Sequence, residues 1–226
     1  MRIIPVLDVM GGIAVHAKKG DRSQYMPLET VVCSGCDPLK LAKAYEERGF
    51  EEIYIADLDA ITGVRPNIKK INEIASNTNL KVMADIGLKR VPEYMVWDFS
   101  PIISSESLAN ISHVVNHEEY VFSIDTKGGS LISACGFSLG ELTDWLRKTS
   151  FKDIIVLDLD IVGTNAGPNL ELVKKISERI GRGVVYGCGI RDVKDIRKLK
   201  DADAEGVLVG SAIHSGKIGE KELHSI

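Results

Sequence analysis

The sequence predicts a closed barrel of eight parallel β-strands surrounded by helices, a (βα)8 or TIM barrel, on two observations. Short apolar runs alternate with helical patterns along the 226 residues, which is typical of right-handed βαβ units. Most runs are continuously apolar, as expected when both faces of a parallel sheet are buried, and eight such units suffice to close the sheet on itself. An open, doubly wound sheet is the alternative. The expected strands are Ile3–Leu7, Glu52–Ala56, Leu80–Ala84, Pro101–Ile103, Tyr120–Ile124, Asp153–Leu157, Gly183–Tyr186 and Ala204–Val209.

Segments with an apolar stripe lie between these runs and predict helices. The first helix is preceded by Asp37 and Pro38, a capping residue and a proline that suits a first helical turn, and Gly49 marks its end. The weakest unit is the third helix, around Val91–Trp97, which is short and contains Pro92. The other expected helices are Leu39–Arg48, Asn67–Ala75, Leu139–Arg147, Leu170–Arg179 and Val193–Leu199.

Four pairs of segments recur in the same order in the two halves of the chain. Together they predict a duplicated half-barrel of four βα units, within one domain that spans residues 1–226. The pairs are Val6–Val15 with Ser123–Ile132, shifted by 117 residues, Glu51–Ala60 with Lys152–Ile161, shifted by 101, and Pro66–Asn67 with Pro168–Asn169 and Ile86–Lys89 with Cys188–Arg191, both shifted by 102.

The change of shift indicates an insertion in the N-terminal half. The first two shifts differ by 16 residues, which places the extra residues around Gly20–Cys36, between the first strand and the second. A loop this long in a compact domain is usually functional and often acts as a lid.

Composition narrows the class of protein. The chain is 44% hydrophobic and 27% charged, which is ordinary for a globular protein, and its net charge of −4 does not favour nucleic-acid binding. No apolar run approaches the roughly 20 residues of a membrane-spanning helix. The N-terminus enters a strand-like run without the cleavage region of a signal peptide, so we expect a cytoplasmic protein.

Two aspartates stand at the ends of equivalent strands. Asp8 ends the first strand and Asp125 the fifth. In a barrel of this kind, the carboxyl ends of the strands form the active site, and two facing carboxylates can divide acid and base work. The alternative is that each aspartate caps the turn after its strand, helped by Gly11–Gly12 and Gly128–Gly129.

Glycines punctuate the loops after the seventh and eighth strands, where barrels of the ribulose-phosphate-binding type hold a phosphate. Gly187 and Gly189 follow the seventh strand, and Gly210 and Ser211 follow the eighth. Tight turns are the alternative explanation of these glycines.

The matching loops of the first half are poorer in glycine. They offer Gly87 and Ser104, and Glu106 adds a negative charge nearby. A second phosphate site is therefore less plainly predicted there.

Thr164 and His16 are two further candidates. Thr164 follows the sixth strand and can offer a hydroxyl to a substrate, although a turn and helix cap also explain its segment. His16 lies just past Asp8 and is equally well explained as a hairpin residue, while His214 and His224 are expected on the surface.

The four cysteines are too few for a disulfide framework at this size. Cys33 and Cys36 have a zinc-like spacing, but Cys135 and Cys188 do not form a second close pair. No metal site is therefore expected.

The chain resembles the HisA/HisF family of histidine-biosynthesis barrels along nearly its whole length. The similarity is carried by IIPVLDVMGG, FSIDTKGG, GTNAGPNLELVKKI, GCGIRD and VLVGSAI, and FSIDTKGG is closest to the isomerase branch, ProFAR isomerase. The resemblance implies an Amadori rearrangement of an aminoaldose to an aminoketose, with Asp8 and Asp125 as the acid–base pair and Thr164 as a helper. It implies no metal or organic cofactor and, unlike the cyclase branch, no glutaminase partner.

The chain also departs from the family pattern. His16 stands where a basic residue is usual, Ile161 and Val162 replace a basic residue and an aspartate, and the first-half phosphate site has lost glycines. Since ProFAR carries phosphates at both ends, these changes suggest a paralogue with a different phosphorylated substrate and with the long loop, including Arg22 and Tyr25, as its specificity element. A lyase or condensing enzyme on a phosphorylated cofactor precursor and a non-catalytic phosphometabolite-binding protein are the alternatives, and retention of both aspartates disfavours the second.

Overall fold

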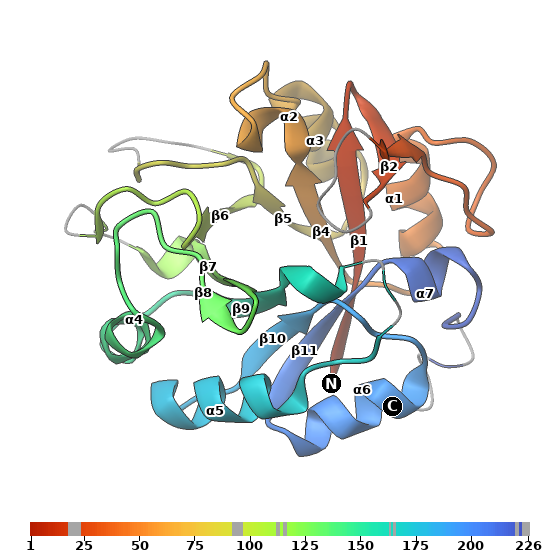
Figure 1. The fold of residues 1–226 in the computed structure, drawn as a ribbon. Helices are drawn as coiled ribbons and strands as arrows, with labels where there is room; N and C mark the ends of the chain where they lie inside the picture. Colours follow the sequence, from red (N-terminus) through yellow and green to blue (C-terminus); the bar gives the residue numbers. More distant parts are fainter. Residues whose placement is uncertain are drawn as a thin grey trace.

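The computed structural model describes residues 1–17, 24–91, 97–111, 114, 117–162, 164, 166–219 and 222. Eight parallel strands form a closed ring, because the last strand pairs with the first, and the predicted (βα)8 barrel is confirmed (Figure 1). In ring order the strands are β1 (Arg2–Met10), β4 (Glu52–Asp57), β5 (Lys81–Asp85), β6 (Ser100–Ser104), β7 (Val121–Lys127), β9 (Asp153–Asp158), β10 (Val184–Gly187) and β11 (Ala204–Val209).

The helices surround this ring, as α5 and α6 do beside β10 and β11 in Figure 1. The five helices expected outside the third unit are present, whereas residues 92–96 of the expected third helix lie outside the described residues. As predicted, Asp37 caps the first helix by accepting a hydrogen bond from the Lys40 N–H at 2.9 Å. The helices are α1 (Pro38–Glu46), α2 (Leu58–Ile61), α3 (Ile68–Asn77), α4 (Leu139–Leu146), α5 (Leu170–Ile180), α6 (Val193–Asp201) and α7 (Ser211–His214), with short 3-10 turns at His117–Glu119 and Leu159–Ile161.

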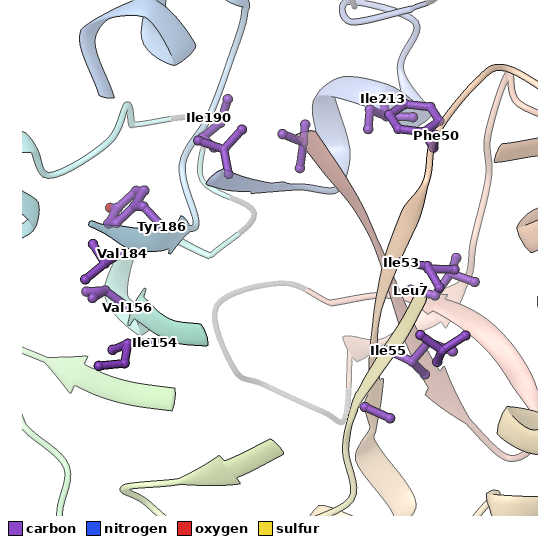
Figure 2. Close-up of a cluster of buried hydrophobic side chains, with 14 of the residues drawn as sticks. Leu7, Phe50, Ile53, Ile55, Ile154, Val156, Val184, Tyr186, Ile190 and Ile213 are labelled. Carbon is purple, nitrogen blue, oxygen red and sulfur yellow. The ribbon is translucent and has the colours of Figure 1, made fainter. Parts of the chain in front are cut away.

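Two apolar layers result from the alternation of side chains along each strand. One layer packs between the strands and the helices, and Figure 2 shows its members on opposite sides of the barrel, with Ile154 and Val156 on one side and Ile53 and Ile55 on the other. The other layer fills the interior of the barrel and contains Tyr54. The alternation therefore leaves Tyr54 facing inward, between two residues that face the helices.

The predicted two-fold repeat appears as matched hydrogen bonds in the two halves. The Gly11 N–H donates to Asp59 of the first half, and the Gly128 N–H donates to Asp160 of the second. A second matched pair joins Asn67 to Asp57 and Asn169 to Asp158 through the asparagine side-chain amides. These contacts fix the turns after the strands in the same way in both halves.

Arg2 joins the two halves at the amino-terminal ends of the strands. Its guanidinium group contacts Glu52 at 2.6 Å and Asp153 at 2.6 Å, and it hydrogen bonds to both oxygens of each carboxylate. Glu52 opens β4 and Asp153 opens β9, and these two residues are equivalent under the repeat. One cation thus links matching positions of both half-barrels, on the face opposite the strand ends that carry Asp8 and Asp125.

The insertion in the first half builds a small antiparallel extension of the barrel. It contributes β3 (Met26–Pro27), which pairs with β2 (Ile13–His16), and β2 corresponds to the shorter β8 (Ser130–Leu131) of the second half. The Val31 N–H donates to the His214 carbonyl at 3.0 Å, so the loop is anchored against α7. Arg22, named above as part of the specificity element, lies outside the described residues.

Candidate active site

A cavity of about 390 Å³ opens at the carboxyl ends of the barrel strands. Its wall includes three aspartates, which are Asp8 on β1, Asp85 on β5 and Asp125 on β7. Other residues of the wall come from β4, β9, β10 and β11 and from the long loop. These are Tyr54, Ala56, Leu157, Gly187, Leu208, Tyr25 and Leu28.

Asp8 lies partly buried in the cavity wall. Burial raises the pKa of its carboxyl group from 3.8 to about 7, because the charged form loses water without gaining a partner. No hydrogen bond to its side chain is formed by any described residue. Asp8 can therefore both hold and release a proton near neutral pH, as an acid–base catalyst requires.

Asp125, the equivalent residue of the second half, is held by hydroxyl groups. One carboxylate oxygen accepts a hydrogen bond from Ser104 at 2.5 Å, and the other accepts one from Ser123 at 2.7 Å. Ser105 and the Glu106 N–H add longer contacts of 3.4 Å to the first oxygen. These donors fix the orientation of Asp125 and stabilise negative charge on it.

Three further predicted residues lie in the wall of this cavity on the side of β10 and β11. They are Gly189, Gly210 and Ser211, next to Gly187 of the strand end itself. A side chain at position 189 is excluded, because a Cβ there would lie 2.6 Å from the Gly167 carbonyl oxygen and the backbone has φ +73°. The sequence pattern therefore brings the four phosphate-site candidates to one side of one cavity.

Cys188, between two of these glycines, has φ 93°, which is the region that favours glycine. A thiol-bearing residue in this conformation carries local strain, and such strain is concentrated at functional sites. Its side chain lies in the cavity wall, and burial raises its pKa above the ordinary value for a thiol.

The first-half candidates Gly87 and Ser104 do not line the cavity. A Cβ at Gly87 would lie 2.7 Å from the Ile61 Cα, so this glycine lets two backbone segments approach, as Gly189 does in the second half. Ser104 is 3% exposed and gives its hydroxyl to Asp125. In this structure, Ser104 is placed to position a carboxylate.

Thr164 and His16 occupy different environments. The Thr164 hydroxyl donates to the Ile161 carbonyl at 2.9 Å and accepts from the Ala166 N–H at 3.3 Å, and the residue is not in the cavity wall. Its neighbours Gly163 and Asn165 lie outside the described residues. His16 is exposed at the end of β2 and does line the cavity.

The expectation that His214 lies on the surface is wrong. His214 is 9% exposed, lies in the cavity wall, and contacts the Thr30 hydroxyl through Nδ1 at 3.1 Å and the Val6 carbonyl through Nε2 at 3.3 Å. Burial lowers the pKa of its imidazole to about 4. The short α7 turns it inward, which the polar composition of the C-terminal segment did not reveal. His224 lies outside the described residues.

Sequence reasoning missed Asp85 and Tyr54 as site residues. Asp85 is 8% exposed at the end of β5, and burial raises the pKa of its carboxyl to about 7. Tyr54 is 5% exposed and its pKa is raised well above the ordinary value by burial and then by nearby aspartates. A tyrosine at an inward position of an apolar strand was the available signal for Tyr54.

Within the described part of the chain, no group of three or more His, Cys, Asp and Glu side chains is placed to hold a metal ion, and Cys33, Cys36, Cys135 and Cys188 are free thiols. No described helix is long and apolar enough to cross a membrane.

Comparison with known proteins relates the whole barrel to one family. The model of the family described as "Histidine biosynthesis protein" matches residues 2–219. An uncharacterized protein of Methanocaldococcus jannaschii is 35% identical over 226 residues, covering 99% of this chain and 97% of the relative.

Two bacterial relatives have named activities. Both are 1-(5-phosphoribosyl)-5-((5-phosphoribosylamino)methylideneamino)imidazole-4-carboxamide isomerases, one from Lactococcus lactis subsp. cremoris and one from Clostridium botulinum. The first is 29% identical over 244 residues, covering 99% of this chain and 96% of the relative. The second is 28% identical over 251 residues, covering 100% and 97%.

Proposed function

Because this chain belongs to the histidine biosynthesis protein family, we propose that it is an aldose–ketose isomerase that rearranges a phosphoribosyl-linked aminosugar of the ProFAR type. One observation carries the proposal. Asp8 and Asp125, equivalent residues of the two half-barrels, line the same cavity in opposite environments. Two carboxylates that differ in this way are suited to two separate proton transfers.

The reaction needs one proton donor and one proton acceptor. Donation of a proton to the ribose ring oxygen breaks its bond to C1 and leaves an imine between C1 and the substrate nitrogen. Removal of the proton from C2 then gives an enolamine, which becomes the ketone when C1 takes up a proton and the C2 hydroxyl gives up its own. Asp8 and Asp125 carry these transfers between them, and atoms and charge balance without an external oxidant or reductant.

The phosphate of the reacting ribose is bound beside β10 and β11 in this proposal. Gly187, Gly189, Gly210 and Ser211 meet there, and backbone N–H groups can approach oxygens closely where no side chain intervenes. Lys127, at the end of β7, lies in the same cavity wall and carries a positive charge.

Turnover by variants of the two aspartates tests the proposal. The substrates are ProFAR and the analogue in which the ribose on the imidazole has a free 5-hydroxyl in place of its phosphate. We expect isomerisation of at least one, with kcat reduced about 10² to 10⁴-fold by Asp8→Asn and by Asp125→Asn. Asp144→Asn, on the exposed face of α4, is the matched control and should keep full activity.

The alternatives give different results. A lyase or condensing enzyme would bind these compounds without isomerising them. A non-catalytic binding protein would bind them with the same affinity whether or not either aspartate is replaced. Either result, obtained with folded protein, would overturn the isomerase proposal.

A further inference from the structure

The two half-barrels present different surfaces to the cavity at equivalent positions. Where the first half has Tyr54, the second has Ile155, and where the first half has Asp85, the second has Gly187. Asp85 ends β5 and Gly187 ends β10, so the comparison concerns the same place in each half. The second half offers backbone to an anion, and the first half offers a hydroxyl and a carboxyl group.

Both first-half groups face the cavity with hydrogen-bonding capacity left over. Tyr54 is 5% exposed and lies in the cavity wall, and its hydroxyl has no hydrogen-bond partner among the described residues. Asp85 accepts a hydrogen bond from the Gly87 N–H at 2.9 Å through one oxygen, and no described residue donates to its other oxygen. Because these polar atoms face the cavity, a ligand group there can form hydrogen bonds with them in place of water.

Charge decides which ligand group fits. Asp125 and Glu106 lie close enough to Asp85 to raise its pKa through their negative charges, after burial itself. The same aspartates act on Tyr54. A phosphate placed here would lie beside carboxylates. No described residue of β4, β5 or β6 contributes a cation to the cavity wall, and Lys127, the lysine that lines the cavity, is on β7.

We propose that Tyr54 and Asp85 determine specificity by binding the far end of the substrate through a hydrogen-bond-donating hydroxyl or nitrogen and by excluding a second phosphate. This inference rests on the proposed function and names its substrate class, a phosphoribosyl aminosugar with a phosphate only at the reacting ribose. Asp85 accepts the hydrogen bond, and Tyr54 completes the contact from the neighbouring strand.

Calorimetric binding of a matched ligand pair tests this inference without requiring turnover. The pair is ProFAR and its analogue with a 5-hydroxyl on the imidazole-bearing ribose, which differ only in the second phosphate. We expect the parent protein to bind the analogue at least about tenfold more tightly, and Asp85→Gly to reverse that preference. Ribose 5-phosphate, which reaches only the β10–β11 side, should bind the parent and Asp85→Gly within about twofold of each other.

Two more variants keep the test decisive. Asp85→Asn retains the size of the side chain and an acceptor for the Gly87 N–H, so it should fold even if Asp85→Gly fails to fold. It should reduce the preference for the analogue over ProFAR at least severalfold. Tyr54→Phe should weaken binding of the analogue without changing binding of ribose 5-phosphate. Ser211→Asp, by contrast, should weaken binding of ribose 5-phosphate.

The outcomes separate the two proposals. Tighter binding of ProFAR than of its analogue by the parent, or a preference that Asp85→Asn and Asp85→Gly leave unchanged, would overturn the inference even if the enzyme is an isomerase. The predicted reversal of preference, without any isomerisation, would support the subsite and overturn the proposed reaction.

Discussion

At the end of β5 the N-terminal half-barrel places Asp85 in the cavity, and at the end of β10 the C-terminal half places Gly187. The contrast extends to the aspartates of β1 and β7. Asp8 stands without a described partner, while serine hydroxyls surround Asp125. Behind these residues, the turns are held by the same glycine–aspartate and asparagine–aspartate bonds in both halves.

This difference teaches which positions of a duplicated barrel are free to diverge. Residues that hold the turns are constrained by geometry, because their carboxylates accept hydrogen bonds from backbone or side-chain N–H groups of those turns. Residues that face the cavity have fewer such bonds, since Asp85 accepts one from the Gly87 N–H and Asp8 accepts none from the described residues. The halves have therefore kept the same frame and acquired different chemistry at the mouth.

The largest expected effect comes from breaking the link between the halves at Arg2. Arg2→Met should lower the free energy of unfolding by about 3–5 kcal/mol, since it leaves Glu52 and Asp153 facing each other, 13% and 6% exposed, without their cation. Urea denaturation would measure it. Arg179→Met, which removes an exposed pair with Asp144, is the control and should change stability by less than about 1 kcal/mol. Equal losses of stability in both variants would mean that the Arg2 link contributes no more than an exposed ion pair.

The equivalent glycines Gly87 and Gly189 give the next largest effect. Each alanine substitution should cost about 2–4 kcal/mol, because the new Cβ meets backbone at 2.7 or 2.6 Å and the residue must keep a positive φ. Gly63→Ala isolates the cost of the positive φ, because Gly63 has φ +77° and open space around it. This substitution should cost about 1 kcal/mol. Thermal denaturation with ribose 5-phosphate added would sharpen the comparison. Only Gly189→Ala should weaken the stabilisation by this ligand, and an equal effect of Gly87→Ala would contradict the assignment of the phosphate to one side.

The smallest effects concern the two aspartates, and that of Asp8 depends on pH. The folded pKa of Asp8, about 7, lies above its unfolded value near 3.8, so the folded state binds the extra proton. The stability that this protonated carboxyl group contributes to the fold is fully present below about pH 4 and is lost as the pH rises through 7. Asp8→Asn should therefore stabilise the protein by about 1–2 kcal/mol at pH 8 and by almost nothing at pH 4.

Asp125→Asn should destabilise the protein at pH 8 by about 1–3 kcal/mol, because the amide nitrogen cannot accept the serine hydrogen bonds. Unfolding midpoints of both variants at pH 4 and pH 8 give the comparison. The same sign of change for both at pH 8 would contradict the difference in environment.

Much of the frame was predictable from the sequence, for reasons that are local. Continuous apolar runs such as Asp153–Leu157 can be buried on both faces only within a parallel sheet, and the structure has β9 at Asp153–Asp158. The repeat could be read because the residues that hold the turns, such as Gly11 and Gly128, recur with fixed neighbours.

The chemistry at the mouth was less accessible, because it depends on contacts between distant residues. Ser104 meets Asp125 across two neighbouring strands, 21 residues apart in the chain, and no local pattern encodes that pair. Tyr54 has the sequence context of an ordinary core residue, and Asp85 that of a turn cap. Their shared cavity follows only from closure of the ring, as does the inward position of His214.

Arg2 also has a consequence for the rate at which the barrel opens. Its two partners lie 50 and 151 residues away along the chain, and the contact with Asp153 forms only once both half-barrels have assembled. An interaction that forms after the folding transition state slows unfolding and leaves the folding rate almost unchanged. We therefore expect Arg2→Met to speed unfolding more than it slows folding, whereas substitutions at the mouth change the chemistry of the site.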